Sequence, residues 1–321
     1  MKKCRVGVLL SRNYQFHCTI AEGIRRIMRH NPDFSITQLL VTHNQDSVRY
    51  RVLDSIRSAD PFDVFVSIGQ RSSIHLSKVF HEISETPPVI HVGLRDPLAL
   101  NLIDSLSIPG RNATAVMRQA HEVTPIAEKI VSLAPFIKRV LIPFWPQGEA
   151  GYIGTQVHQV AEYLRGHNVT VKPLPLESRE DTLESLKNNI SARDCVLFLE
   201  GAGNGGVIRE AAYACLERDA LLFADGLEAI MTGAGIVFGG DLYPFAIGVE
   251  QILNSFFYDK TPIGFIPVVV LPNNMQFVAN AFMLRAIGVP DELINGLQQS
   301  KEMMLIKKWI NCPVAGISYG E

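Results

Sequence analysis

The stretch VFVSIGQRSSIHLSKVFHEISETPPVIHVGLRDP, residues 64–97, decides the fold class of this chain. It begins with the apolar run Val64–Ile68, continues with a helical pattern over Ile74–Ile83 and ends with a second apolar run, Val89–Val92. A strand, a helix and a strand in this order are typical of a βαβ unit, in which the two strands are parallel. The stretch therefore predicts an α/β fold.

The same alternation extends to both sides of this stretch. It predicts earlier strands over 5–10 and 35–41, earlier helices over 19–29 and 47–58, and a later strand over 112–116. A second series starts near residue 122, with helices over 123–133, 151–165, 179–189 and 206–218 and strands over 139–143, 169–174, 195–199, 221–224 and 236–238. Two series of this kind predict two Rossmann-like lobes, each with a parallel sheet.

The remaining residues have too few apolar runs for a third α/β domain. They predict a helix over Pro244–Phe257, a strand over Ile266–Leu271 and a helix over Met275–Ile287, which ends at Gly288. We expect this part to cross back and complete the two lobes. The expected N-terminal lobe is 1–121 plus about 244–262, and the expected C-terminal lobe is 122–243 plus about 263–321.

Composition narrows the classes of function. The 321 residues are 47% hydrophobic, with 30 Lys and Arg against 32 Asp and Glu and a formal net charge of −2. The charges are interleaved, which argues against a nucleic-acid or membrane-surface partner. No apolar run approaches the roughly 18–20 residues of a membrane span. The five cysteines are widely spaced, and we expect free thiols and no metal site.

Ligands of open parallel sheets bind beyond the carboxyl ends of the strands, where helices begin. Polar and aromatic residues that follow the predicted strands are therefore the candidates for ligand binding. They are Ser11, Tyr14, Gln70, Ser72, Ser73, Asp96, Trp145, Glu200, Asn204, Asp225 and Asp241.

Several of these candidates have a structural alternative. The Gly69–Ser73 segment opens a helix and suits a carboxylate or phosphate, but a serine there can also simply cap the helix. Asp225 and Asp241 can hold a ligand ammonium or cap helices of their own. Trp145 and Tyr14 can stack on a ligand, although most tryptophans are packing residues first.

One glycine-rich loop resembles a nucleotide motif. Gly201–Gly206 fits G-x-G-x-x-G after a predicted strand and before a helix. Glu200 directly precedes it, and its carboxylate would repel a pyrophosphate. We find no hydrolase, zinc-protease or Walker-type motif, and a lone strand histidine such as His91 is more often structural. We therefore expect no cofactor and no enzymatic activity.

Five short segments together resemble one protein family. PVIHVGLRDP (88–97) and LIDSLSIPGRNAT (102–114) are similar to a block of ABC-transporter substrate-binding proteins of the tryptophan/tyrosine-uptake type. KRVLI (138–142), GDLY (240–243) and AIGVP (286–290) resemble later motifs of that family in the same order.

The resemblance implies the type I periplasmic-binding-protein fold, with a hinge and a ligand cleft between the lobes. It implies a solute-binding component of an ABC importer that closes on an amino-acid-like ligand, with an aromatic amino acid favoured. The partners would be that ligand and an ABC permease, with no nucleic acid and a monomeric chain. In this interpretation Ser72 and Ser73 take the carboxylate, Asp225 or Asp241 the ammonium, and Tyr14 or Trp145 stacks on the side chain.

Two departures from the family keep other functions open. The segments 69–73 and 200–206 differ from the family pattern, which leaves open a ligand other than the usual aromatic amino acid. No signal-peptide core precedes the first strand, so we expect a periplasmic or cell-surface protein if a signal was removed and a cytoplasmic one if Met1 is the native start. The alternatives are a cytoplasmic small-molecule sensor of the same fold or an enzyme that binds a nucleotide through Gly201–Gly206.

Overall fold

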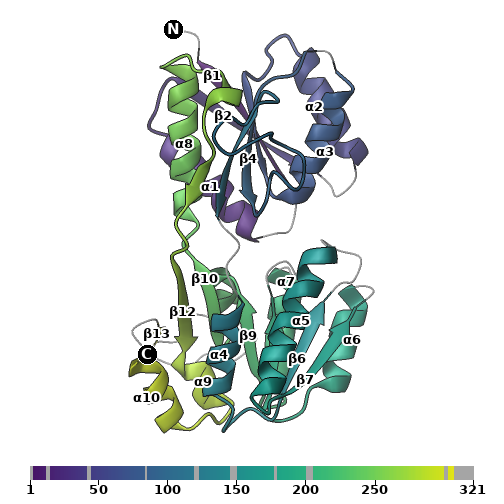
Figure 1. Ribbon diagram of the computed structural model, residues 1–321, viewed down its shortest axis with the longest axis vertical. Helices are drawn as coiled ribbons and strands as arrows, with labels where there is room; N and C mark the ends of the chain where they lie inside the picture. Colours follow the sequence, from purple (N-terminus) through teal and green to yellow (C-terminus); the bar gives the residue numbers. More distant parts are fainter. Residues whose placement is uncertain are drawn as a thin grey trace, which may run out of the picture. The chain divides into compact units, whose positions relative to one another are not determined.

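The computed structural model describes residues 3–11, 15–41, 45–83, 85–118, 123–144, 150–176, 179–199, 205–299 and 303–306. The chain divides into two compact units, each built around its own sheet (Figure 1). Unit 1 comprises residues 1–120 and 241–273, and unit 2 comprises residues 121–240 and 274–321. Both units have the predominantly parallel α/β architecture of a type I periplasmic binding protein, as the sequence predicted.

Unit 1 has the sheet order β11-β5-β4-β3-β1-β2, and the pairs are parallel. Its elements are β1 (Cys4–Ser11), α1 (Gln15–Met28), β2 (Phe34–Val41), α2 (Gln45–Arg57), β3 (Val64–Ile68), α3 (Gln70–His81), β4 (Val89–Leu94), β5 (Ala113–Arg118), α8 (Tyr243–Phe257), η2 (Ile263–Phe265) and β11 (Val269–Leu271). Helices α1 and α8 lie on one face of the sheet, and α2 and α3 lie on the other (Figure 1). One apolar cluster lies between the sheet and α1 with α8, and a second lies between the sheet and α2 with α3. Because both faces are covered, the strands read as continuous apolar runs.

Unit 2 has the sheet order β13-β12-β10-β9-β8-β6-β7. Its elements are α4 (Thr124–Ser132), β6 (Arg139–Phe144), α5 (Ala150–Gly166), β7 (Thr170–Pro175), α6 (Arg179–Asn189), β8 (Asp194–Phe198), α7 (Gly205–Leu216), β9 (Leu221–Asp225), η1 (Leu227–Thr232), β10 (Ile236–Gly240), β12 (Met275–Asn280), α9 (Ala281–Ala286), α10 (Asp291–Gln299) and β13 (Met303–Ile306). Helices α4, α5, α9 and α10 share one core cluster with the sheet, and α6, α7 and η1 share the other.

The prediction of one helix over Met275–Ile287 is wrong in its first half. Met275–Asn280 is the strand β12, which pairs antiparallel with β10, and only Ala281–Ala286 is helical. The ring of Phe277 packs on that of Phe238 in β10, with centroids 4.5 Å apart. This strand partner, about forty residues earlier in the chain, overrides the local helical pattern.

The place where the chain leaves unit 1 for unit 2 the second time also differs from the sequence-based expectation. Residues 263–273 were expected in the C-terminal lobe, but they belong to unit 1. Strand β11 pairs with β5, and the Thr114 hydroxyl donates a hydrogen bond to the carbonyl of Ile266 at 2.8 Å. These contacts hold the segment in unit 1 until the chain crosses at Asn273.

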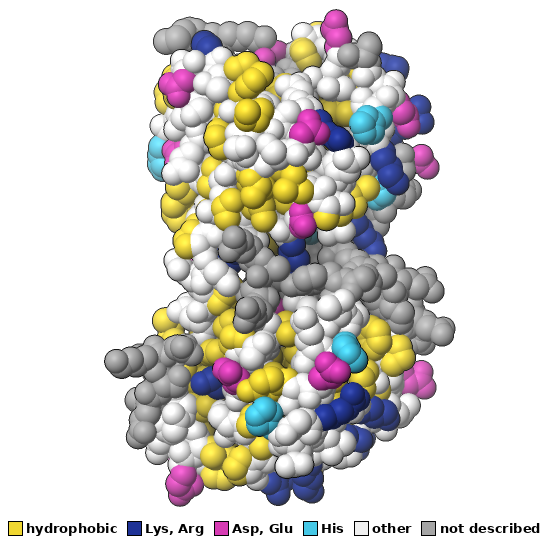
Figure 2. Space-filling model, viewed as in Figure 1, with side chains coloured by type: hydrophobic (Ala, Val, Ile, Leu, Met, Phe, Trp, Pro, Cys, Tyr) yellow, Lys and Arg dark blue, Asp and Glu magenta, His cyan; other side chains and the backbone are white. Residues whose placement is uncertain are grey.

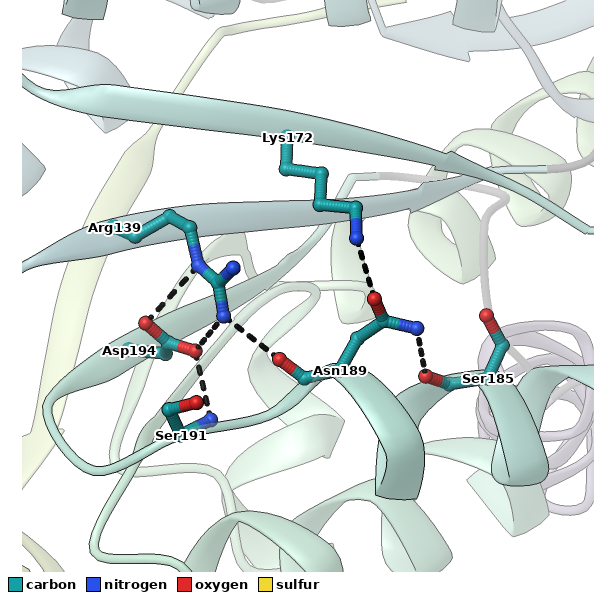
Figure 3. Close-up of polar contacts among 6 residues, drawn as sticks. All are labelled: Arg139, Lys172, Ser185, Asn189, Ser191 and Asp194. Atoms are coloured by element: carbon teal, nitrogen blue, oxygen red, sulfur yellow. Dashed lines mark hydrogen bonds and ion pairs between the residues drawn. The ribbon is translucent and has the colours of Figure 1, made fainter.

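A network of hydrogen bonds and an ion pair connects the strands of unit 2 near the amino ends of β6 and β8 (Figure 3). Arg139 and Asp194 are register partners at the starts of β6 and β8, and the guanidinium donates to both carboxylate oxygens. Asp194 is buried and also accepts the N–H of Ser191 at 2.8 Å. Lys172 donates to the side-chain oxygen of Asn189, and the backbone carbonyl of Asn189 accepts from Arg139. The network is satisfied by groups of the protein itself, which indicates a structural role.

Candidate functional site

The carboxyl ends of the strands in unit 1 are where a ligand is expected to bind. Strands β1, β3, β4 and β5 end at this edge, and α1 and α3 begin from it. The sequence placed Ser11, Gln70, Ser72, Ser73 and Asp96 here. The structure brings a further set of side chains to the same edge, and these come from α1, β5 and α8.

Two rings from the start of α1 lie against glycines at the ends of neighbouring strands. Gly69, after β3, has φ +88°, and a β-carbon there would lie 2.2 Å from Nε2 of His17. Gly93 forms a bulge near the end of β4 with φ +73°, and a β-carbon there would lie 2.9 Å from the Phe16 ring. Glycine is therefore required at both positions for the rings to approach the sheet edge.

Phe16 and His17 continue into a small aromatic group. Their rings meet edge to face with centroids 5.7 Å apart, and Phe16 meets the buried Phe245 of α8 in the same way at 6.0 Å. Phe16 and His17 are themselves half-buried. We call these three residues the aromatic edge cluster. Half-buried rings at a strand-end edge offer an apolar, stackable surface.

The hydroxyls of Ser72 and Ser73 point into the interior of unit 1. Ser72 donates to the carbonyls of Ile68 and Gly69, and Ser73 donates to the hydroxyl of Ser67 at 3.3 Å. Both side chains are almost fully buried. Gly69 is the N-cap residue of α3, and no side chain caps it, so the capping alternative for these serines is not observed. The first N–H groups of α3 are the part of this motif that remains suited to an anion.

Arg118, the last residue of β5, has well-defined partners within unit 1. Its guanidinium donates to the backbone carbonyl of Asp241 and lies over the ring of Phe245, 5.2 Å from the centroid. The exposed carboxylate of Asp241 accepts the N–H of Tyr243 at 2.9 Å, where α8 begins. This bond closes a turn just before α8, whose N-cap residue is Leu242 and has no side-chain cap, so the capping alternative for Asp241 is not observed.

Two other candidates of unit 1 have simpler surroundings. Asp96 is exposed, and its carboxylate accepts the N–H of Ala99 at 2.9 Å to close a turn after β4. Gln70 is half-buried and is the first residue of α3. Ser11 is the last residue of β1, at the expected edge, and only its backbone is described.

In unit 2 the candidate that the structure describes is Asp225. It is the last residue of β9 and is half-buried. The next residue, Gly226, has φ +117° and donates its N–H to the carbonyl of Phe238 at 2.7 Å. This turn directs the chain into η1 and leaves Asp225 at the carboxyl end of its strand.

Four candidates, Tyr14, Trp145, Glu200 and Asn204, lie outside the described residues, and their roles stay predictions. The same holds for residues 201–204 of the glycine-rich loop.

His91, expected to be structural, lies in the middle of β4 and is buried. Burial lowers its pKa to about 4. It is therefore a neutral residue of the core at physiological pH, away from the strand-end edge.

The sequence did not predict His17, Arg118 or Phe245 as residues of this edge. Gly69 and Gly93 were available as signals, because a glycine directly at a strand end indicates a close approach by another group. Nothing local marks Arg118, since its partners lie more than 120 residues later in the chain.

Within the described residues, no group of three or more His, Cys, Asp or Glu side chains is placed to hold a metal ion. In the same part of the chain, no helix has the length and apolar character that crossing a membrane requires.

Solved structures share the fold of this chain. The ABC domain in complex with L-Trp from Streptococcus pneumonia superposes with a TM-score of 0.72 at 16% identity, over 93% of this chain and 100% of that chain. A conserved domain protein from Vibrio cholerae has a TM-score of 0.76 at 16% identity, over 95% and 100%. A carbohydrate transporter from Acidothermus cellulolyticus in complex with myo-inositol has a TM-score of 0.56 at 10% identity, over 91% and 99%. No curated protein matches the sequence.

The sequence itself matches one family. The model of the family described as ABC transporter substrate binding protein covers residues 20–199, which is more than half of the chain. This span runs from α1 through the strands β2 to β5 of unit 1 to the end of β8 in unit 2. The chain belongs to the family of ABC transporter substrate binding proteins.

Proposed function

We propose that this protein binds an amino-acid-like ligand, an aromatic amino acid above all, between its two lobes and delivers it to an ABC permease by hinge closure. Family membership supports a small-molecule ligand and a permease partner. The aromatic edge cluster is the observation that carries the ligand class, because rings at a strand-end edge favour a planar apolar side chain. The L-Trp complex of the S. pneumonia neighbour supports the same class.

The proposed ligand contacts in unit 1 follow from the geometry of α3 and α1. The carboxylate of the ligand binds the first N–H groups of α3, assisted by the half-buried Gln70. Ser72 and Ser73 contribute through the backbone they hold, since their hydroxyls are engaged inside the unit. The side chain of the ligand lies on Phe16 and His17, with Tyr14 or Trp145 as the opposite stacking surface.

The proposed contact in unit 2 is an ion pair. Asp225, half-buried at the carboxyl end of β9, holds the ligand ammonium in this proposal. The protein performs no chemistry on its ligand in this proposal. It acts as a monomer on the outer side of the cytoplasmic membrane, where members of the family work.

A thermal-shift screen tests the ligand class. The protein is unfolded and refolded to remove any ligand carried through purification, and then mixed with the twenty amino acids, common nucleotides, myo-inositol and small sugars. A ligand at 100 times its dissociation constant adds about 2.7 kcal/mol to the free energy of unfolding, which is a readily measured shift. Stabilisation by Trp, Tyr or Phe supports the proposal, and stabilisation by sugars or a nucleotide alone contradicts it.

A matched pair of variants tests the proposed ammonium contact. Asp225→Asn removes the charge at the end of β9, and Asp259→Asn removes a charge from an exposed position of unit 1. We expect the first variant to lose most of the stabilisation by the amino acid and the second to retain it. Equal stabilisation of both variants would assign the ammonium to another group.

A further inference from the structure

The chain passes between the two units three times, after residues 120, 240 and 273. Unit 1 supplies one element next to each passage. Strand β5 ends at Arg118 before the first passage, helix α8 begins at Tyr243 after the second, and strand β11 ends at Leu271 before the third.

These three elements form one packed block. Strands β5 and β11 are parallel neighbours, and Arg118 is the register partner of Leu271. Helix α8 lies on both strands at Gly248, where a β-carbon would be 2.7 Å from Val116 and 3.2 Å from Val269. Any side chain at residue 248 would push the helix away from the strands. The three passages therefore start from a common, tightly packed base.

Arg118 ties the three passages together at the end of this block. Its backbone pairs with Leu271, and its guanidinium donates to the carbonyl of Asp241, the first residue of unit 1 after the second passage. The guanidinium also lies over Phe245, in the first turn of α8. A side chain with several donors in a fixed plane can make both contacts at once, which a lysine ammonium does less well.

We propose that Arg118 is the positioning residue of the hinge. It fixes the three points at which the connecting segments join unit 1. The two units are therefore restricted to one bending path, instead of moving independently on three flexible linkers. This inference rests on the proposed function, because only a binding protein that closes by a hinge needs that restriction. A restricted path also favours ligand binding, since affinity scales with the fraction of molecules able to reach the closed arrangement.

The distribution of distances between the units is the direct readout. Spin labels are placed at Arg51→Cys on α2 and Gln159→Cys on α5, two exposed positions in different units. Cys18, which is exposed, and Cys312 are replaced by serine. The other cysteines are buried, and burial raises the pKa of the Cys4 thiol to about 12, so they resist labelling. Pulsed electron paramagnetic resonance then measures the distribution without any ligand.

We expect Arg118→Ala to widen the distance distribution at least twofold. Arg111→Ala, which breaks the ion pair with Asp104 elsewhere in unit 1, is the matched control and should leave the width unchanged. Arg118→Lys keeps a cation over Phe245, so its distribution should be narrower than that of Arg118→Ala. If Arg118→Ala does not fold, the comparison of Arg118→Lys with Arg118→Gln decides, with the glutamine variant expected to be wider.

Other results would overturn the inference. An Arg118→Ala distribution as narrow as that of the unmodified protein shows that the Arg118 side chain does not restrict the motion of the units. Equal widening in Arg111→Ala shows a general loosening of unit 1. Addition of L-tryptophan to the labelled protein is a separate arm. An unchanged mean distance after this addition counts against the proposed ligand. The role of Arg118 is then still decided by the widths measured without ligand.

Discussion

The imidazole of His17 lies directly on Gly69, at a distance that leaves no room for a β-carbon. Gly69 has φ +88° and ψ +161°, a backbone conformation that is essentially restricted to glycine. The end of β3, the start of α3 and the start of α1 therefore meet at a point that only glycine allows. This is the geometry from which the proposed anion contact at α3 arises.

Gly69→Ala tests the importance of this contact. We expect the free energy of unfolding to fall by at least about 1–3 kcal/mol from backbone strain alone, with a further loss from displacement of His17. Urea denaturation followed by circular dichroism measures it. Gly154→Ala is the control, because that glycine lies within α5 with nothing within 4 Å of an added β-carbon. It should gain up to about 1 kcal/mol from helix propensity. A Gly69→Ala protein as stable as the unmodified one would contradict the assigned contact.

His91 predicts a dependence of stability on pH. Burial lowers its pKa from 6.5 to about 4, so the folded protein binds fewer protons there than the unfolded chain. Stability from this group is complete above pH 6.5 and decreases as the pH falls from 6.5 toward 4, by up to about 3 kcal/mol. The measurement is urea denaturation at pH 7.0, 6.0 and 5.0.

The His91→Leu variant should be less sensitive to this pH change than the unmodified protein. The control is His158→Gln, since His158 is exposed and pairs only across one helix turn with Glu162. Its pH profile should match that of the unmodified protein. A His91→Leu profile with the same slope would assign the pH dependence to other groups.

The ion pair at the start of β6 and β8, in which Asp194 is buried and Arg139 is partly exposed, gives a prediction about charge balance. Arg139→Met leaves the buried carboxylate of Asp194 without its partner, and we expect a loss of about 3 kcal/mol in the free energy of unfolding. In Arg139→Met combined with Asp194→Asn, the charge is gone and the amide oxygen can still accept the N–H of Ser191. The double variant should therefore be more stable than Arg139→Met alone, and the reverse order would contradict this account.

Asn280 sets the boundary between β12 and α9. Its side chain accepts the N–H groups of Phe282 and Met283 at 3.1 and 3.2 Å, and it is buried. Asn280→Ala should cost about 1–2 kcal/mol, and Asn280→Asp should cost less, because an aspartate can still cap the helix. Thermal unfolding measures both, with Asn295→Ala on an exposed face of α10 as the control. Equal stability of the alanine and aspartate variants would show that the cap does not determine the boundary.

The strands and helices of both lobes were predictable because their patterns are local. Runs such as Val64–Ile68 are apolar throughout because both faces of a parallel sheet are covered, and helix-forming segments separate them. The polar candidates at strand ends could likewise be named from the chain order alone. Their side-chain directions could not, as Ser72 and Ser73 show, since a serine at a helix start can cap the helix, bind a ligand or donate to the preceding strand.

The sequence by itself determined the α/β alternation, the two-lobed organisation and the family resemblance, all of which depend on residues near each other in the chain. Only the tertiary structure decided that Met275–Asn280 is a strand, that 263–273 belongs to unit 1, and that Arg118 meets Asp241 and Phe245. Each of these depends on a partner far away in the sequence, and the free energy of such a contact exists only after the fold has brought the two segments together.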